Sequence, residues 1–253
     1  MLPYFAGAAA LVFAGYHTMG PTSQLYGRTF TGESPGSKRL ALTFDDGPSD
    51  PHTLHLLDVL AKHKALATFF MIGAHVAQRS RIARAVAESG HEIGNHTHMH
   101  PLLTLKSRKM VRAEAQACEA ALWDATGRRS RLFRPPYGAR RPGVLREIRE
   151  LGYEAVMWRV AGYDWRTQSD AEIERNVRSR IRGGEVILLH DGSPENGADR
   201  SGTVQATELL LSGLSAQGYR FVTVSEMLGS RLGANATSAE PIANALRPRA
   251  EFH

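Results

Sequence analysis

Two adjacent carboxylates, Asp45 and Asp46, end a short apolar run in the segment ALTFDDGPSD. Neighbouring acids repel each other, and Gly47-Pro48 turns the chain directly after them. One carboxylate could cap the helix that follows, but the second needs a different partner. The pair is therefore a candidate for chemistry.

A histidine-rich turn, NHTHMH, lies at residues 95–100, at the end of a later predicted strand. His96 and His100 are four residues apart, so one helical turn would point both imidazoles in the same direction. Two histidines and one carboxylate leave the fourth position of a zinc ion open for water, which is how catalytic zinc is held. Two alternatives stay open: surface or capping histidines, and a pairing of His96 with His98 on an extended strand.

Short apolar runs alternate with helical patterns along most of the chain. The predicted strands lie at 40–45, 67–72, 91–95, 131–134, 153–160, 185–190 and 219–224. The predicted helices lie at 51–64, 75–89, 104–126, 141–151, 170–182 and 203–216. This alternation indicates an α/β fold with parallel strands and right-handed crossovers, either a closed or nearly closed barrel or a doubly wound open sheet.

Unusual polar residues recur at the carboxyl ends of five predicted strands, where α/β folds build their sites. They are Asp45-Asp46, His96–His100, Arg134–Gly138, Asp164-Trp165 and His190–Gly192. No G-x-G-x-x-G follows a strand, so a dinucleotide site is not supported. Acids, imidazoles and an arginine on one rim indicate a catalytic site.

These segments resemble five signatures of the NodB-type polysaccharide deacetylases, carbohydrate esterase family 4. They are Thr43–Pro48, His96-Thr97-x-x-His100, Arg134-Pro-Pro-Tyr-Gly, Asp164-Trp165 and Leu188-Leu189-His190. They occur in the family's order, and the resemblance covers residues 38–228. It implies a distorted (β/α) barrel with about seven parallel strands. The implied activity is metal-dependent removal of N-acetyl groups from N-acetylated amino sugars in a polysaccharide, with release of acetate.

The resemblance also implies a role for each matching residue. Asp45 would be the general base, while Asp46, His96 and His100 would bind one divalent metal ion. Zinc is expected, and cobalt or nickel would fit the same ligands. The two adjacent carboxylates would then have different partners, a cation and a water.

Six further residues would complete the implied site. Arg134 would keep Asp45 ionised and oriented, and the backbone N–H of Tyr137 would stabilise the oxyanion. Trp165 and Leu188 would line a pocket for the acetyl methyl group. Asp164 would pair with His190 and favour the imidazolium that a general acid needs.

One position departs from the family pattern. Many relatives carry an acid three residues before the Asp-Trp pair, where this chain has Ala161. We expect a local adjustment and not a loss of activity.

The N-terminus is apolar from Leu2 to Tyr16, and no charged residue precedes Arg28. Fifteen residues are short for a spanning helix and suit an export signal, although a positive n-region and an A-x-A site are missing. The alternative is a start segment that is packed on the core or misassigned. We predict a signal or membrane anchor at 1–20, a linker at 21–37, the deacetylase domain at 38–228 and a loose tail at 229–253.

The net charge and the single cysteine limit which classes of partner and chemistry we expect. The net charge of +6 favours anionic surroundings, and the basic stretch at 128–146 carries no nucleic-acid motif. The single cysteine, Cys118, lies on an apolar helical stripe and is expected to be a buried structural thiol. We expect an extracytoplasmic monomer that acts on a glycan, with no nucleic-acid partner.

Two rival functions share the same fold. One is a non-catalytic carbohydrate-binding descendant, and the other is a hydrolase of O-acetyl esters or other amides. Peptidoglycan, chitin-type oligosaccharides and exopolysaccharides all remain open as the polymer.

Overall fold

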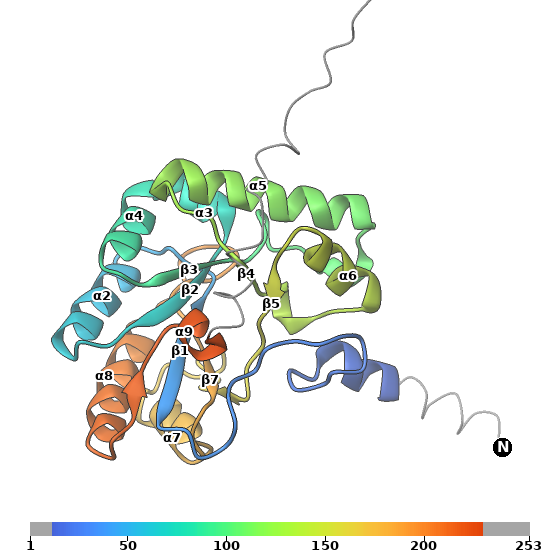
Figure 1. Cartoon of the computed structure of the whole chain (residues 1–253). Helices are drawn as coiled ribbons and strands as arrows, with labels where there is room; N and C mark the ends of the chain where they lie inside the picture. The colour runs from blue at the N-terminus through green and yellow to red at the C-terminus, as the bar shows by residue number, and fades with distance from the viewer. Residues whose placement is uncertain (1–11, 230–253) are drawn as a thin grey trace, which may run out of the picture.

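The computed structural model of the protein describes residues 12–229 (Figure 1). The predicted tail from residue 230 onward and the first eleven residues of the predicted signal segment lie outside the described residues. Residues 12–19 are helical. Within the described part of the chain, no helix has the length and apolarity needed to cross a membrane.

Parallel strands form a curled sheet at the centre of the molecule. They are β1 (Arg39–Asp45), β2 (Ala67–Met71), β3 (Glu92–Asn95), β4 (Leu132–Phe133), β5 (Glu154–Ala155), β6 (Val160–Ala161), β7 (Val186–His190) and β8 (Arg220–Phe221). Seven of them follow the order β5-β4-β3-β2-β1-β7-β6, and β8 pairs with the start of β1. The predicted α/β architecture with seven parallel strands is confirmed.

The sheet cannot be flat, because its two ends are joined by a very short connection. β5 and β6 lie at opposite ends of the strand order, yet only residues 156–159 separate them. Such a connection spans at most about 18 Å. A flat sheet would put its first and seventh strands about 29 Å apart. The sheet therefore curls into a distorted barrel, and the open doubly wound alternative is excluded.

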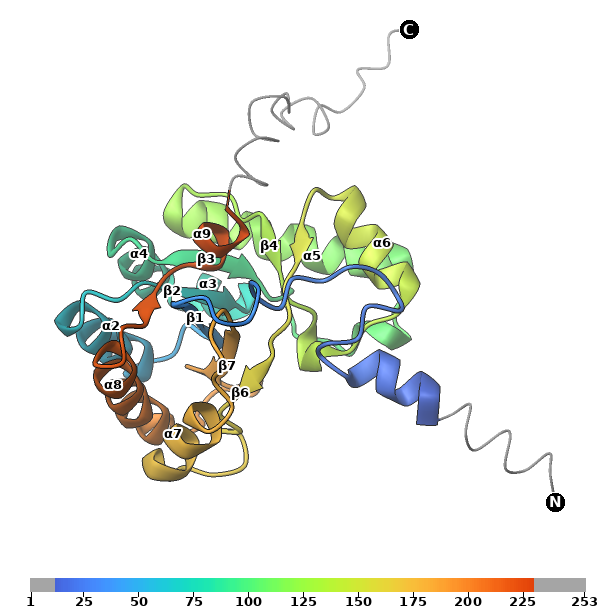
Figure 2. The same cartoon turned by 60° about the horizontal axis from the view of Figure 1, so that its bottom comes forward.

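Helices surround the outside of this barrel (Figure 2). They are α2 (His52–Lys62), α3 (Gly73–Gln78), α4 (Ser80–Glu88), α5 (Arg108–Thr126), α6 (Pro142–Glu150), α7 (Asp170–Arg178) and α8 (Ser201–Ser215). The last helix, α9 (Val224–Leu228), packs instead against the residues that fill the barrel. The hydroxyl groups of Ser107, Ser169 and Thr223 cap the first turns of α5, α7 and α9. Gly127, with φ of 66°, ends α5 in the left-handed conformation.

Strand alternation divides the core into two layers. On β1, Leu40, Leu42 and Phe44 face outward into the cluster that packs against the surrounding helices. Ala41 lies in a second cluster, which β2, β4, β7 and α9 complete and which fills the barrel. Asp45 shares the inward face with Ala41, so its carboxylate points into the top of the barrel. The predicted buried thiol, Cys118, is confirmed as fully buried.

Four predicted elements differ from the structure. The strand at 153–160 is split into β5 and β6, because residues 156–159 cross between the two ends of the sheet. The helix at 75–89 is two helices that break at Arg79, and the helix at 104–126 begins only at 108, after a 3-10 turn. The strand at 219–224 ends at 221, because Thr223 and Glu226 form a capping box that starts α9.

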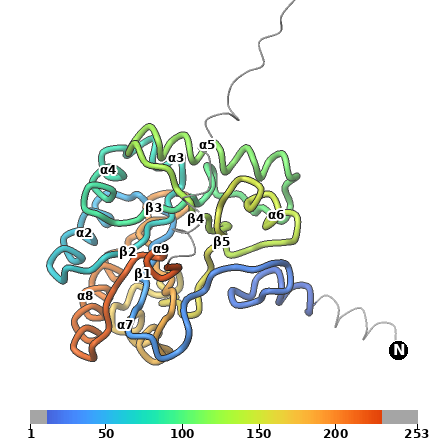
Figure 3. Tube along the Cα trace, in the orientation of Figure 1, coloured from blue at the N-terminus to red at the C-terminus, as the bar shows by residue number. Residues whose placement is uncertain are grey.

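The segment before β1 runs along the barrel (Figure 3). Phe30 forms a bridge with Val156, and Gly32 forms one with Glu185. The buried side chain of Arg140 donates hydrogen bonds to the carbonyls of Gly20 and Ser23, at 2.6 and 2.8 Å. These contacts attach both ends of residues 20–32 to the barrel.

Candidate active site

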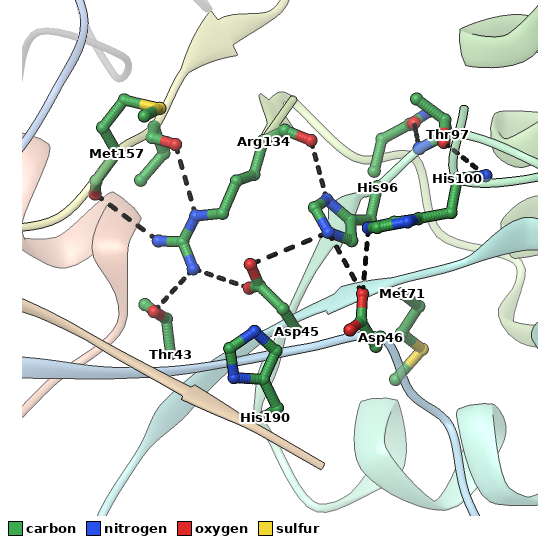
Figure 4. A network of polar contacts seen from close by, with 12 residues as sticks. Thr43, Asp45, Asp46, Met71, His96, Thr97, His100, Arg134, Met157 and His190 are labelled. Atoms are coloured by element: carbon green, nitrogen blue, oxygen red, sulfur yellow. Dashed lines mark hydrogen bonds and ion pairs between the residues drawn. The ribbon is translucent and has the colours of Figure 1, made fainter. Parts of the chain in front are cut away.

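The candidate metal ligands Asp46, His96 and His100 lie together at the top of the barrel (Figure 4). Oδ1 of Asp46 is 3.4 Å from Nε2 of His96 and 3.2 Å from Nε2 of His100. All three residues are buried. Asp46 comes from the end of β1 and the two histidines from the end of β3, so the parallel pairing of β1, β2 and β3 brings them together.

The spacing of the two histidines suggested a helical turn, but the structure shows that they do not lie on one. Thr97 and His100 both have left-handed φ values, of 68° and 55°. The turn is held by its own side chains: Asn95 Oδ1 accepts the N–H of Thr97, and Thr97 Oγ1 accepts that of His100. Left-handed residues other than glycine are strained and cluster at functional sites.

Neighbouring hydrogen bonds fix how two of these groups face the centre. Nδ1 of His96 lies 2.7 Å from the carbonyl oxygen of Arg134, which only accepts, so Nδ1 carries the proton. The other ring nitrogen of His96, Nε2, then faces Oδ1 of Asp46. His75 likewise donates from Nδ1 to the carbonyl of Asp46, at 2.9 Å.

This arrangement fits a cation. Oδ1 of Asp46 is buried without a hydrogen-bond partner in the described residues, although two imidazole nitrogens face it. Acceptor atoms that point at one another repel unless a proton or a metal ion lies between them. Two imidazoles and one carboxylate are the donors that zinc and its neighbours in the first transition row prefer.

The protonation states suit metal binding as well. Burial alone would raise the pKa of Asp46, but the close imidazoles of His100 and His96 outweigh it and hold this pKa well below its usual value. Burial lowers the pKa of His100, and Asp46 opposes this only in part. An ionised carboxylate and a neutral imidazole are the forms that bind metals.

Asp45 has a different partner from Asp46. Its Oδ1 accepts a hydrogen bond of 2.6 Å from Nη1 of Arg134, which also donates to Thr43 at 2.8 Å. Arg134 is fully buried inside the barrel, with its guanidinium 4.1 Å from the centre of the Phe70 ring. Oδ2 of Asp45 points towards His96, 3.7 Å from its Nε2. A buried arginine therefore holds one oxygen of Asp45 and leaves the other beside the metal ligands.

His190 and Asp164 form a second charged pair across the same rim. Nδ1 of His190 lies 2.8 Å from Oδ1 of Asp164. Burial would lower the pKa of His190, but the negative charge of Asp164 and its hydrogen bond outweigh this and raise it to about 9. The pKa of Asp164 is correspondingly lowered, in spite of its burial. The imidazole is therefore protonated at neutral pH.

The three predicted substrate-binding residues surround these groups. Tyr137 has φ of 59° and 54% of its surface exposed, and its ring lies 4.6 Å from that of His100. Trp165 is 44% exposed, with its ring 5.3 Å from that of His190. Leu188 is buried on β7, paired with Thr43 on one side and Ala161 on the other. All ten predicted site residues thus lie around one rim or just beneath it.

A comparison with known proteins decides the family. A peptidoglycan-N-acetylglucosamine deacetylase of Bacillus cereus is 38% identical to this chain over 201 residues, which are 78% of this chain and 92% of that protein. Residues 32–156 also match the family model for polysaccharide deacetylase. The chain belongs to the polysaccharide deacetylase family.

Two further members show the range of this family. A chitooligosaccharide deacetylase of Sinorhizobium fredii is 36% identical over 201 residues, with 77% of this chain and 94% of that protein covered. The crystal structure of a pseudoenzyme of carbohydrate esterase family 4 from Bacillus anthracis superposes with a TM-score of 0.74 at 26% identity, covering 79% of this chain and 69% of that one. The fold of a polysaccharide deacetylase therefore does not by itself guarantee turnover.

The sequence did not point to several residues that support the site of this deacetylase. Thr43 could have been found, because strand alternation places it on the same face as Asp45. Thr203, which donates to Oδ2 of Asp164 at 2.9 Å, comes from α8 and has no local signal. The same holds for Arg200, which donates to the Asp164 carbonyl, and for His75.

Proposed function

We propose that the protein is a metal-dependent hydrolase that removes acetyl groups from N-acetylated amino sugars in a polysaccharide. The observation that carries this proposal is the grouping of three elements on one rim. A metal-binding set (Asp46, His96 and His100) lies on the same rim as an arginine-held carboxylate, Asp45, and a protonated imidazole, His190. Hydrolysis of an amide needs a proton acceptor for water and a proton donor for the amine, and these two groups supply them.

Asp46, His96 and His100 would hold the divalent ion, with zinc as the expected metal. A bound ion of this kind polarises the acetamide carbonyl and makes a water more acidic at neutral pH. Cobalt and nickel suit the same nitrogen and oxygen donors, so the ligands do not single out zinc.

The chain's own residues then move the protons. Asp45 accepts a proton from the attacking water through Oδ2, while Arg134 keeps Oδ1 occupied and the carboxylate oriented. His190 donates a proton to the nitrogen of the departing sugar amine, and Asp164 stabilises the imidazolium beforehand. The products are acetate and a free amino sugar.

The remaining residues position the acetamide. The backbone N–H of Tyr137 stabilises the negative charge on the carbonyl oxygen. Trp165 and Leu188 exclude water from around the acetyl methyl group. The left-handed backbone of Tyr137 supports this role, since strained residues persist where function requires them.

A non-catalytic carbohydrate-binding protein is the first rival, because one structural relative is a pseudoenzyme. The rival is disfavoured because Asp45, Asp46, His96, His100 and His190 are all present and mutually oriented. An esterase for O-acetyl groups is the second rival, since the same groups would cleave an ester. Acetate release from N-acetylated and O-acetylated forms of one glycan, measured side by side, separates the three functions.

We rank peptidoglycan N-acetylglucosamine ahead of chitin-type oligosaccharides as the substrate. A relative acts on each, but the positive charge of this chain suits an anionic cell wall. An enzyme of peptidoglycan works outside the cytoplasmic membrane, so we propose export or an N-terminal tether, with the domain at 38–228 acting as a monomer. The test is acetate release from peptidoglycan, chitin oligomers and an exopolysaccharide, with metal-stripped protein as the control.

A further inference from the structure

A polar cavity of about 450 Å³ lies between the loop that follows β6 and helix α7. It is lined by Tyr163, Arg166, Thr167, Glu172, Asn176 and Arg180. Glu172, Asn176 and Arg180 are spaced by four residues along α7 and the turn after it, which places them on one side of the helix. None of the six takes part in the proposed reaction.

Two arginines approach the same aromatic ring in this cavity. The guanidinium carbons of Arg166 and Arg180 lie 5.5 and 5.6 Å from the centre of the Tyr163 ring. The Arg166 side chain makes no hydrogen bond or ion pair with any residue in the range 12–229. The Arg180 side chain makes one hydrogen bond within the same range, to the carbonyl of Asn176 at 2.6 Å. Because each guanidinium carries five N–H donors, both keep donors for a ligand.

The charge of the cavity suits a single negative group. Neither arginine is paired with a carboxylate among the described residues. Glu172 lines the same cavity, and its Oε2 accepts a hydrogen bond from Thr167 at 2.9 Å. The two guanidinium groups and this carboxylate leave one net positive charge. That balance favours one carboxylate, which arginine binds with two parallel hydrogen bonds, over a doubly charged phosphate.

Aromatic contacts connect the cavity with the catalytic rim. The Tyr163 ring lies 5.2 Å from that of Trp165, which lies 5.3 Å from the ring of His190. Tyr163 has a left-handed φ of 57°, and two hydrogen bonds fix its loop: Asn176 donates to the carbonyl of Gly162, and the N–H of Arg166 donates to that of Tyr163. Trp165 thus contacts both Tyr163, which lines the cavity, and His190, which stands at the catalytic rim.

We propose that this cavity binds a carboxylate on the sugar residue next to the one that is deacetylated. The enzyme then prefers an N-acetylated glycan with acidic residues over a neutral chitin-type glycan of the same length. This inference rests on the proposed function, because it assigns a substrate class to the same catalytic rim.

The test uses two glycans that differ at one group. One is an N-acetylated oligosaccharide whose alternate residues carry a carboxylate, and the other has each carboxylate converted to its methyl amide. Acetate release by the wild-type protein is expected to favour the acidic glycan about tenfold in kcat/KM, mainly through KM, and less at high salt. The double variant Arg166→Ala/Arg180→Ala should lose this preference and keep its activity on the neutral glycan.

A matched control removes the same amount of charge from helix α7, outside the cavity. Arg175 and Arg178 are exposed on α7, and Arg178 pairs with Glu174 at 3.0 Å. The double variant Arg175→Ala/Arg178→Ala should keep the preference. If it lost the preference as fully as the cavity variant, net charge would explain the effect and the proposal would be wrong.

Three further results would overturn the inference, and calorimetry keeps it separate from the proposed function. The first result is an equal kcat/KM of the wild-type protein for both glycans, and the second is a preference that survives in the cavity variant. The third is competitive inhibition by inorganic phosphate without any preference for the carboxylate glycan. If neither glycan released acetate, the proposed function would fail. Calorimetric binding of the two glycans to His190→Ala protein would then decide the inference, with tighter binding of the acidic glycan expected.

Discussion

Asp164 binds His190 through both of its carboxylate oxygens. Oδ1 lies 2.8 Å from Nδ1 of the imidazole, while Oδ2 accepts the main-chain N–H of His190 at 2.7 Å. Thr203 donates to the same Oδ2. The carboxylate thus fixes the position of the histidine backbone and the charge of its ring together.

The first prediction concerns the alkaline limb of the pH profile. The pKa of His190 is raised to about 9, so the imidazolium that donates the proton is present below that pH and is lost above it. Activity should therefore fall as the pH rises through about 9. In Asp164→Asn, burial remains but the negative charge is gone, so the limb should move to about 6.5 or lower. The measurement is kcat as a function of pH.

The control for this experiment is Thr203→Val, which removes a neutral hydrogen bond and keeps the carboxylate. Its alkaline limb should stay close to that of the wild type. An alkaline limb that did not move in folded Asp164→Asn protein would assign that limb to a group other than His190.

The second prediction separates the proton donor from the metal ligands. His96→Ala should lose both bound metal and activity, because it removes one of three ligands. His190→Ala should keep its metal and lose turnover by about a hundredfold or more, the usual contribution of a positioned acid. Elemental analysis after dialysis and acetate release are measured on the same preparations. Near-normal turnover of His190→Ala would mean that another group protonates the amine, and His98 would be tested next.

Much of this site followed from the sequence, because parallel strands bring their carboxyl ends to one rim. Asp45, Arg134 and His190 end predicted strands and His96 directly follows one, so their grouping needed only the strand order. The relative roles of the adjacent acids needed the family resemblance, since both stand in the same local sequence. The structure adds the physical difference, an arginine partner for Asp45 and two imidazoles for Asp46.

Other features could not be predicted, because their partners are distant in sequence and follow no periodic pattern. The two-residue strands β5 and β6 are too short to be distinguished from one longer run. The left-handed turn that carries His96 and His100 depends on the Asn95 and Thr97 side chains, so the spacing of the histidines suggested a helix instead. The attachment of residues 20 and 23 depends on the single side chain of Arg140.

The third prediction concerns Arg140, which is buried without a carboxylate partner among the described residues. Its guanidinium donates to the carbonyls of Gly20, Ser23 and Gly138, the last at 3.0 Å. Arg140→Met would leave the carbonyls of Ser23 and Gly138 without partners among the described residues, and the Gly20 carbonyl would keep only the N–H of Ser23. The free energy of unfolding should therefore fall by about 3 kcal/mol. Gly138 directly follows Tyr137, whose backbone N–H is proposed to stabilise the oxyanion, so kcat should fall as well. Denaturant unfolding and acetate release measure the two effects.

Arg141→Met is the matched control for this variant. Arg141 also donates to backbone carbonyls, those of Thr104 and Lys106, but it is only partly buried, so water can replace it. Its loss should cost about 1 kcal/mol and leave kcat close to normal. Equal effects of the two substitutions would show that Arg140 has no special connection with the catalytic loop.

The last prediction concerns Gly47, the residue directly after Asp46. A Cβ at this position would lie well inside van der Waals contact of the Asp191 carboxylate. Asp191 is fully buried and cannot easily move, because its Oδ2 accepts a hydrogen bond of 2.6 Å from Thr53 and its main-chain N–H is bonded to the Asp45 carbonyl at 3.1 Å. In Gly47→Ala the backbone of Asp46 must therefore shift instead.

A displaced Asp46 no longer meets His96 and His100 at the observed distances. Metal affinity should fall about ten- to a hundredfold, as it does when the support of a ligand is disturbed. Competition with a chelator of known affinity measures this, and excess metal should restore part of the activity. Gly15→Ala is the control, because a Cβ there meets nothing within 4 Å and should leave metal affinity unchanged. Wild-type metal affinity in Gly47→Ala would show that the loop yields without moving the ligand, and that Asp191 does not hold Asp46 in place.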